Sequence, residues 1–143
     1  MTNPHAQPVN VAVVGLGFMG ITHIKSYQQL PGARLVAVCD AFRQPVNGVL
    51  AGVSGNISSS DALDLGRDLR AYKQLEDLLQ DDAVDLIDLC VPTPLHAPQA
   101  IAALQSGKHV LCEKPLARTS AIAREIVNAA KSARGFFMPA MCM

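Results

Sequence analysis

Apolar residues along the chain form two alternating patterns, one typical of buried strands and the other of helices. Short apolar runs bounded by turn residues predict strands at residues 9–14, 33–39, 84–91, 109–112 and from 136 onward. Between these runs, apolar positions recur at helical spacing in residues 18–30, 75–79, 95–106 and 119–134. Thr119 is the expected N-cap of the last helix, and Gly135 follows its end.

Strands that alternate with helices of this length are βαβ units, which pair in parallel through right-handed crossovers. We therefore predict the α/β class: a doubly wound, mostly parallel sheet of six strands, five of them placed above, with helices on both faces. Residues 41–70 are less regular, because glycines and the serines at 58–60 interrupt any long helix. For that stretch we expect a short helix followed by a mobile loop. Residues 1–8 are expected to be a flexible tail, and residues 9–143 a single domain.

Composition and charge narrow the classes of protein that this domain could be. The 143 residues are 50% hydrophobic and 17% charged, and twelve basic residues balance twelve acidic ones. Because the chain has no net positive charge, binding to nucleic acid or to an anionic membrane is disfavoured. The apolar runs are too short to span a membrane, and the first ten residues lack the pattern of a secretory signal. We expect a cytoplasmic protein.

The cysteines and the known catalytic motifs give no indication of a metal site. The four cysteines stand singly, without the paired spacing that zinc sites use, and are expected to be reduced thiols; they are Cys39, Cys90, Cys112 and Cys142. The chain has no Ser–His–Asp order, no HExxH and no calcium-binding loop. The sequence therefore favours neither a hydrolase nor a metalloprotein.

A glycine-rich turn, GLGFMG at residues 15–20, directly follows the first strand and opens the first helix. Asp40 ends the next strand, 20 residues after Gly20, which completes the context of a dinucleotide-binding fingerprint. Gly15 would form the tight turn, Gly17 would let the backbone approach a pyrophosphate, and Gly20 would allow close packing of helix against strand. The alternative is a purely structural strand–turn–helix. The predicted cofactor-binding residues of this turn are Gly15, Gly17, Phe18, Met19 and Gly20.

Asp40 also indicates which dinucleotide binds. A carboxylate at this position accepts hydrogen bonds from the adenosine ribose hydroxyls and repels a 2′-phosphate, so NAD is favoured over NADP. Arg43 is a further candidate contact because it could reach a 2′-phosphate, although a solvated surface cation is the alternative. We predict that Asp40→Ser weakens the binding of NAD and improves that of NADP relative to it.

Two more polar clusters follow predicted strands at their carboxyl ends, where open α/β sheets bind ligands. Residues 92–96, PTPLH, offer Pro92, Thr93 and His96 to such a cleft, although a histidine in a first helical turn can also be a solvated or capping residue. Glu113 and Lys114 precede Pro115, and lysine can act in proton transfer. A surface ion pair is the alternative for these two. His23, early in the first helix, could neighbour a cofactor or simply pack or face solvent.

Together, GLGFMG, His23, Cys39-Asp40, PTPLH and GKHVLCEKPLA resemble the N-terminal Rossmann domain of the glucose–fructose oxidoreductase/inositol dehydrogenase/MocA family. The stretch from Gly107 to Pro115 is the most specific part of the resemblance. Members of that family move a hydride between a nicotinamide cofactor and a hydroxyl-bearing carbon, usually of a sugar or cyclitol. The resemblance also implies a Lys114–Pro115 bond that is often cis.

The resemblance assigns a role to each of these positions. It implies that residues 15–20 hold the pyrophosphate, that Asp40 holds the adenosine ribose and that Glu113 approaches the nicotinamide ribose. Lys114 would be the catalytic lysine beside the reacting hydroxyl. It also implies that Pro92, Thr93 and His96 line the cofactor cleft.

Family enzymes carry a second domain that binds substrate and supports oligomerisation, and these 143 residues do not include it. We therefore expect a truncated chain that binds NAD without turnover, with a sugar or polyol substrate and a homo-oligomer as properties of the full-length protein. The alternative is a non-catalytic dinucleotide-binding module such as a sensor or scaffold. Lys114 favours the enzyme, because a sensor needs no such group beside the nicotinamide.

Overall fold

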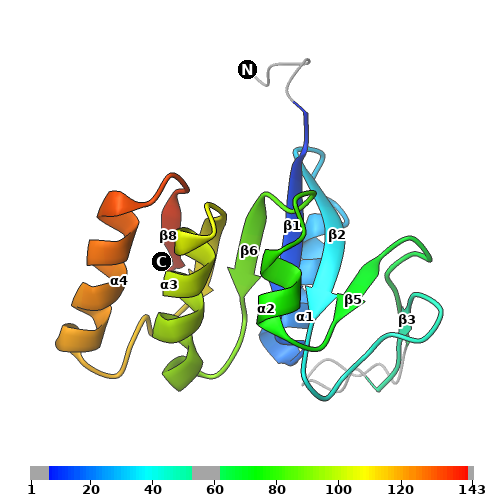
Figure 1. The fold of residues 1–143 in the computed structure, drawn as a ribbon. Coiled ribbons are helices and arrows are strands. Elements are labelled where there is room, and N and C mark those ends of the chain that lie inside the picture. The colour runs from blue at the N-terminus through cyan, green and yellow to red at the C-terminus, as the bar shows by residue number, and fades with distance from the viewer. Residues whose placement is uncertain (1–6, 53–61, 142–143) are drawn as a thin grey trace.

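The computed structural model describes residues 7–52 and 62–141, which form a parallel sheet of six strands in the order β5-β2-β1-β6-β7-β8 (Figure 1). The strands of this sheet are β1 Val9–Val14, β2 Ala33–Cys39, β5 Arg70–Tyr72, β6 Leu86–Leu89, β7 His109–Glu113 and β8 Phe137–Ala140. The helices are α1 Phe18–Tyr27, α2 Leu75–Leu79, α3 His96–Gln105 and α4 Ser120–Ser132, with a short 3₁₀ turn η1 at Thr93–Leu95. The predicted six-stranded α/β sheet is confirmed.

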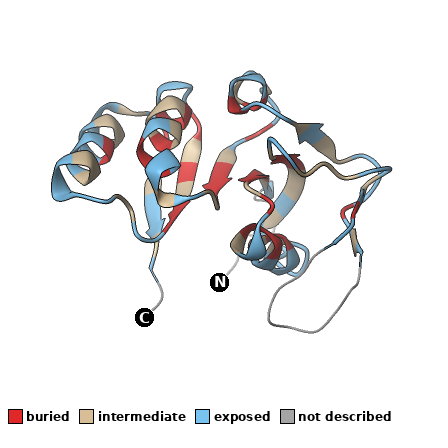
Figure 2. Ribbon diagram, turned by 90° about the horizontal axis from the view of Figure 1, so that it is seen from below, coloured by how far each residue is buried: buried red, intermediate tan, exposed pale blue. Residues whose placement is uncertain are grey.

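Two buried clusters, one on each face of the sheet, form the core. Successive residues of β1 alternate between them: Val11 and Val13 pack with α1, whereas Ala12 and Val14 pack with α2, α3 and α4. Figure 1 shows α1 behind the sheet and the other three helices in front of it. Figure 2 shows that buried residues lie mainly in the strands and on the helix faces turned toward them. Both faces of the central strands are therefore covered, as in a doubly wound fold.

The prediction of a helix within residues 41–70 is wrong for the described part of that stretch, 41–52 and 62–70. The chain instead forms a small antiparallel pair, β3 Val49–Leu50 with β4 Leu63–Asp64. Just before β3, Asn47 and Gly48 have positive φ and turn the chain between Val46 and Val49. The buried side chain of Leu50 joins the α1 face of the core. Residues 53–61, part of the predicted loop, lie outside the described residues. The strand that the sequence pattern did not place is β5, beside β2.

The ends of the other elements follow local chemistry. The Thr119 side chain accepts a hydrogen bond from the Ile122 N–H and caps α4, as predicted. Pro139 lies in β8 at the edge of the sheet, where a missing N–H costs no ladder hydrogen bond. Among the described residues, no helix has the length and apolar character needed to cross a membrane.

The strand order changes direction between β1 and β6. From β1 the chain builds outward through β2 and β5, and then returns to the other side of β1 with β6, β7 and β8. In open α/β sheets, ligands bind in the crevice at the carboxyl ends of the strands at such a switch point. The glycine turn follows β1, residues 90–96 follow β6, and Glu113 ends β7, so all three predicted clusters lie at that edge.

Candidate functional site

The glycine turn connects β1 to α1 in a conformation that depends on two of its glycines. Gly15 has φ +91°, and a Cβ atom there would lie 2.6 Å from the carbonyl oxygen of Cys90. A Cβ atom at Gly20 would collide with the carbonyl of Gly15. The turn therefore brings β1, α1 and the end of β6 close together because neither position has a side chain.

Gly17 has a different environment, because a Cβ atom there would meet nothing within 4 Å. Gly17 is the N-cap of α1 and has no side chain to bond the first helical N–H groups, and the first turn has no acidic residue. Those N–H groups, together with the helix dipole, favour an anion at this end of α1. Phe18 and Met19 begin the helix here, and the Phe18 side chain is 52% exposed.

Asp40 follows β2 and joins the glycine turn to the next loop. Its Oδ2 accepts a hydrogen bond from the Leu16 N–H at 2.8 Å, and its Oδ1 accepts from the N–H groups of Phe42 and Arg43 at 2.8 and 2.9 Å. Partial burial acts to raise the pKa of Asp40, but these three backbone hydrogen bonds and the Arg43 charge outweigh it and lower the pKa below its ordinary value. The carboxylate is thus held charged beside the glycine turn.

The Arg43 guanidinium lies across the same turn. It donates hydrogen bonds to the carbonyl oxygens of Leu16, Ala51 and Gly52, the last at 2.8 Å. Arg43 therefore ties the glycine turn to residues 51–52 instead of standing free in solvent, and three of its donor contacts are already made.

His96 lies inside the protein, unlike a solvated or capping histidine, with only 1% of its surface exposed. Its Nε2 lies 2.8 Å from the carbonyl oxygen of Val91, and its Nδ1 lies 2.9 Å from that of Pro115. Both ring nitrogens contact backbone, so the side chain joins the turn after β6 to the turn after β7. Pro92 and Thr93, which precede His96, are exposed and half-buried, respectively.

Glu113 and Lys114 follow one another at the end of β7 but have opposite environments. Glu113 is buried at 5% exposure, and its Oε2 accepts a hydrogen bond from the Lys114 N–H at 2.9 Å. Lys114 itself is exposed, and the Lys114–Pro115 bond is cis, as the resemblance implied. The two side chains do not form the surface ion pair that was the alternative: Glu113 turns inward.

A polar cluster beneath this edge was not predicted from the sequence. Asp88, entirely buried in β6, accepts hydrogen bonds at Oδ2 from Tyr27 Oη at 2.9 Å and contacts His23 Nδ1 at 2.8 Å. His23 Nε2 lies 3.3 Å from Glu113 Oε1, and Cys90 Sγ lies 3.4 Å from His23 Nδ1. Of these residues, the sequence indicates only His23 and Glu113 as candidates for the cofactor site. The available signal for Asp88 was its place in the middle of the apolar run at 84–91, whose other carboxylate, Asp85, stands near the start of the run.

Burial and charge perturb the titration of this cluster. The hydrogen bond to Asp88 raises the pKa of His23 above its ordinary value against the opposing effect of burial, and Glu113 adds to the increase. Burial and the Asp88 charge raise the pKa of Tyr27 and of Cys90. The phenol and the thiol therefore stay protonated near neutral pH, and the raised pKa of His23 shifts its equilibrium toward the charged form.

His23, Asp88 and Cys90 place one donor atom each within 4.8 Å of one another, a spacing that could hold a metal ion. These atoms already contact one another, and a metal would need the Cys90 thiolate that burial disfavours. The donor set therefore fits a hydrogen-bonded cluster better than a metal centre.

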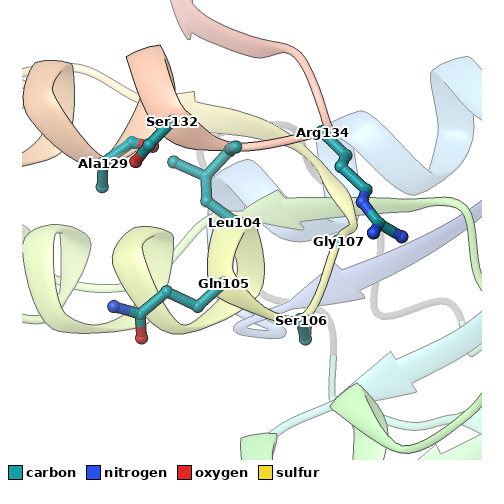
Figure 3. A pocket seen from close by; sticks show the side chains of 8 residues that line it. Leu104, Gln105, Ser106, Gly107, Ala129, Ser132 and Arg134 are labelled. Atoms are coloured by element: carbon teal, nitrogen blue, oxygen red, sulfur yellow. The ribbon is translucent and has the colours of Figure 1, made fainter.

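A groove of about 460 Å³ between the ends of α3 and α4 lies away from this edge (Figure 3). It is lined by Leu104, Ser106 and Gly107 from the segment before β7, and by Ala129, Ser132 and Arg134 from the end of α4. Because the segment at 104–107 precedes β7, the groove is at the amino end of the sheet, opposite the glycine turn.

Comparison with known proteins places the fold in a family. Residues 9–141 match the model of an oxidoreductase family with an NAD-binding Rossmann fold. A levoglucosan dehydrogenase from Pseudarthrobacter phenanthrenivorans is 33% identical over 125 residues, which are 87% of this chain and 31% of the relative. A glycosyl hydrolase family 109 protein from a Shewanella species is 32% identical over 128 residues, 90% of this chain and 27% of the relative.

Solved structures of oxidoreductases share this fold. A levoglucosan dehydrogenase in complex with NADH superimposes with a TM-score of 0.72 at 26% identity, covering 94% of this chain and 35% of that one. An NAD-binding oxidoreductase from Klebsiella pneumoniae has a TM-score of 0.71 at 29% identity, covering 94% of this chain and 34% of that one. The chain thus spans about a third of the length of the proteins that it matches.

Proposed function

The chain belongs to the oxidoreductase family with an NAD-binding Rossmann fold, and we propose that it binds the NAD of a dehydrogenase that oxidises a sugar- or polyol-type hydroxyl. The observation that carries this proposal is the contact between Asp40 and the glycine turn at the switch point of the sheet. The names of the relatives, a levoglucosan dehydrogenase and a glycosyl hydrolase, support a carbohydrate substrate.

The glycine turn offers a fitting place for the pyrophosphate. The space in front of Gly17 is open, and the free N–H groups at the start of α1 point out of the helix there. Phe18, Met19 and Gly20 would supply these donors. The adenosine ribose would then lie against Asp40, and the adenine beside Phe42, whose ring is 96% exposed next to that carboxylate.

The same residues favour NAD over NADP. The charge that Asp40 keeps at the ribose position repels a 2′-phosphate. Arg43 is the cation that could offset this repulsion, but its guanidinium is engaged by the carbonyls of Leu16, Ala51 and Gly52. A 2′-phosphate would have to compete with those contacts.

We assign the nicotinamide end of the site to the turns after β6 and β7. Pro92 and Thr93 would line the cleft, with His96 holding the two turns together from inside. The bound nicotinamide supplies the hydride acceptor. Glu113 would hold its ribose, and the exposed Lys114 would orient the substrate hydroxyl and assist the transfer of its proton through Nζ.

We also propose a cellular location and an assembly state for the whole protein. The three cysteines that the structure describes are free, which fits a reducing cytoplasm. Exposed apolar side chains at Phe136 and Met138, along the β8 edge, fit a homo-oligomer or a further domain in the complete gene product. A sensor or scaffold is less well supported, because it gives Lys114 no role.

The test is a calorimetric titration of the 143-residue chain with NAD⁺ and with NADP⁺, before and after Asp40→Ser. We expect the wild type to bind NAD⁺ more tightly and Asp40→Ser to lower the ratio of the two affinities by at least about tenfold, or 1.4 kcal/mol. The ratio is the informative quantity, because loss of the hydrogen bonds that Asp40 accepts from the backbone weakens the binding of both cofactors alike.

Two results would overturn the proposal. Absence of NAD⁺ binding by a folded wild-type chain would remove the cofactor role itself. An unchanged NAD⁺-to-NADP⁺ ratio in Asp40→Ser would show that Asp40 does not face the ribose. In the complete gene product, release of sugar from nitrophenyl glycosides without a change in NADH absorbance would favour hydrolysis over oxidation.

A further inference from the structure

The buried cluster beneath the cofactor edge connects α1 to Glu113 through a single side chain, His23. One ring nitrogen of His23 contacts Asp88 at 2.8 Å, and the other lies 3.3 Å from Glu113. Asp88 is buried in β6 and Glu113 at the end of β7, so the imidazole, which comes from α1, bridges two neighbouring strands.

The hydrogen-bonding chemistry of Asp88 and Glu113 determines which protonation state of the His23 ring fits between them. Ionised carboxylates only accept hydrogen bonds, and a neutral imidazole donates from only one of its nitrogens. An imidazolium donates from both, so it alone satisfies Asp88 and Glu113 together. The raised pKa of His23, caused first by its hydrogen bond to Asp88, agrees with this form.

The bridge holds Glu113 at both of its oxygens. Oε2 accepts from the Lys114 N–H, and Oε1 faces His23 Nε2. His23 is itself fixed, because its Asp88 partner also accepts a hydrogen bond from Tyr27, one helical turn further along α1. The carboxylate therefore has a set orientation before any ligand arrives, and that orientation depends on a proton.

We propose that His23 is a positioning residue: as an imidazolium anchored on Asp88, it orients the Glu113 carboxylate for the nicotinamide ribose and makes cofactor affinity depend on pH. The proposal rests on the proposed function, because Glu113 needs a ligand to orient toward. His23 touches neither the cofactor nor the substrate in this scheme and acts only through Glu113.

The direction of the pH dependence follows from the groups that face His23. These are Asp88 from β6, Glu113 from β7, Cys90 after β6, and Tyr27 from α1 itself. The raised pKa values of Tyr27 and Cys90 keep those groups neutral in the relevant range. As pH rises through the pKa of His23, above its ordinary 6.5, the imidazolium is lost and NAD⁺ affinity is expected to fall.

The experiment measures the dissociation constant of NAD⁺ for the 143-residue chain by calorimetry between about pH 5.5 and 9. In the wild type we expect binding to weaken about tenfold across the range, as expected for loss of one hydrogen bond to a charged group. In His23→Gln we expect binding that is about tenfold weaker near pH 6 and nearly independent of pH. A variant that keeps the wild-type slope would overturn the proposal.

His109→Asn is the matched control, because His109 is also a histidine of the described chain but lies at the start of β7, away from the cluster. Its Nδ1 accepts a hydrogen bond from the Phe136 N–H, which an asparagine oxygen can replace. We expect this variant to keep the wild-type pH profile. A purely structural His23 would instead lower the stability of His23→Gln without changing the slope of binding against pH.

An NMR titration of the histidine rings in the wild type and in Glu113→Gln tests the bridge without relying on the folding of His23→Gln or on NAD⁺ binding. We expect the His23 ring to titrate above its ordinary pKa, and at a lower pH in Glu113→Gln, because one carboxylate charge is gone. Equal titration in both chains would overturn the bridge. A wild type that binds NAD⁺ at no pH contradicts the proposed function, whereas binding without a pH slope contradicts only the role of His23.

Discussion

Replacing Gly17 with alanine tests the proposed pyrophosphate site separately from the stability of the glycine turn. Gly17 is the N-cap of α1 with φ −77°, a conformation that alanine adopts readily. A Cβ atom at this position meets no atom within 4 Å, in contrast to Gly15 and Gly20. The free chain should therefore accept Gly17→Ala without rearrangement.

Two small effects on stability oppose each other in this variant. Alanine reduces the freedom of the unfolded chain, which stabilises by about 0.4–1 kcal/mol. Alanine is also a poorer N-cap than glycine, which costs about as much. The free energy of unfolding should therefore change by less than about 0.5 kcal/mol in either direction.

Cofactor binding should change much more. The added methyl group occupies the space through which a pyrophosphate would reach the N–H groups at the start of α1. Loss of two hydrogen bonds to a charged group costs about 3 kcal/mol, which weakens binding roughly 100-fold. Calorimetric titration with NAD⁺ measures the binding, and urea denaturation followed by circular dichroism measures the stability.

Gly32→Ala is the matched control for Gly17→Ala. A Cβ atom at Gly32 also meets nothing within 4 Å, but Gly32 precedes β2 at the amino end of the sheet. This variant should bind NAD⁺ like the wild type. Unchanged binding by Gly17→Ala would refute the placement of the pyrophosphate, and an unfolded Gly17→Ala would refute the open space in front of α1.

Two further changes test other parts of the molecule. In the complete gene product, Lys114→Ala should leave NAD⁺ affinity unchanged, because this lysine is exposed beside the site. The same variant should lower turnover by about 10²–10⁴-fold. A wild-type rate of NADH formation would remove Lys114 from the proposed mechanism. Thr119→Ala should lower the free energy of unfolding by about 1 kcal/mol through loss of the α4 cap, and a urea midpoint equal to that of the wild type would show that the cap contributes nothing.

The long elements of the fold could be predicted because each has a clear local pattern. The apolar repeat of residues 119–134 corresponds to α4 at Ser120–Ser132, and the run at 33–39 corresponds to β2. The short strands lack such a pattern. β5 has only Arg70, Ala71 and Tyr72, and it is a strand because its backbone pairs with the end of β2. That pairing is a long-range contact that no local pattern indicates.

His96 illustrates the same limit at the site. Its position in the first turn after a strand correctly indicated the carboxyl end of the sheet. Its environment depends on the carbonyl of Pro115, nineteen residues away, in the turn that follows β7. The sequence could place the residue at the edge but could not show that its ring lies inside.

Asp88 shows which signal the sequence did contain. Burial of a carboxylate without hydrogen-bond donors is strongly unfavourable in a parallel strand that is covered on both faces. Asp88, between Ile87 and Leu89, therefore requires donors from a helix on the side of the sheet to which it points. His23 and Tyr27 stand four residues apart, one turn of helix, and so share a face of α1. Once the sheet order is known to place β6 beside β1, the buried carboxylate and the two donors of α1 can be paired with one another. The local sequence patterns do not give that strand order.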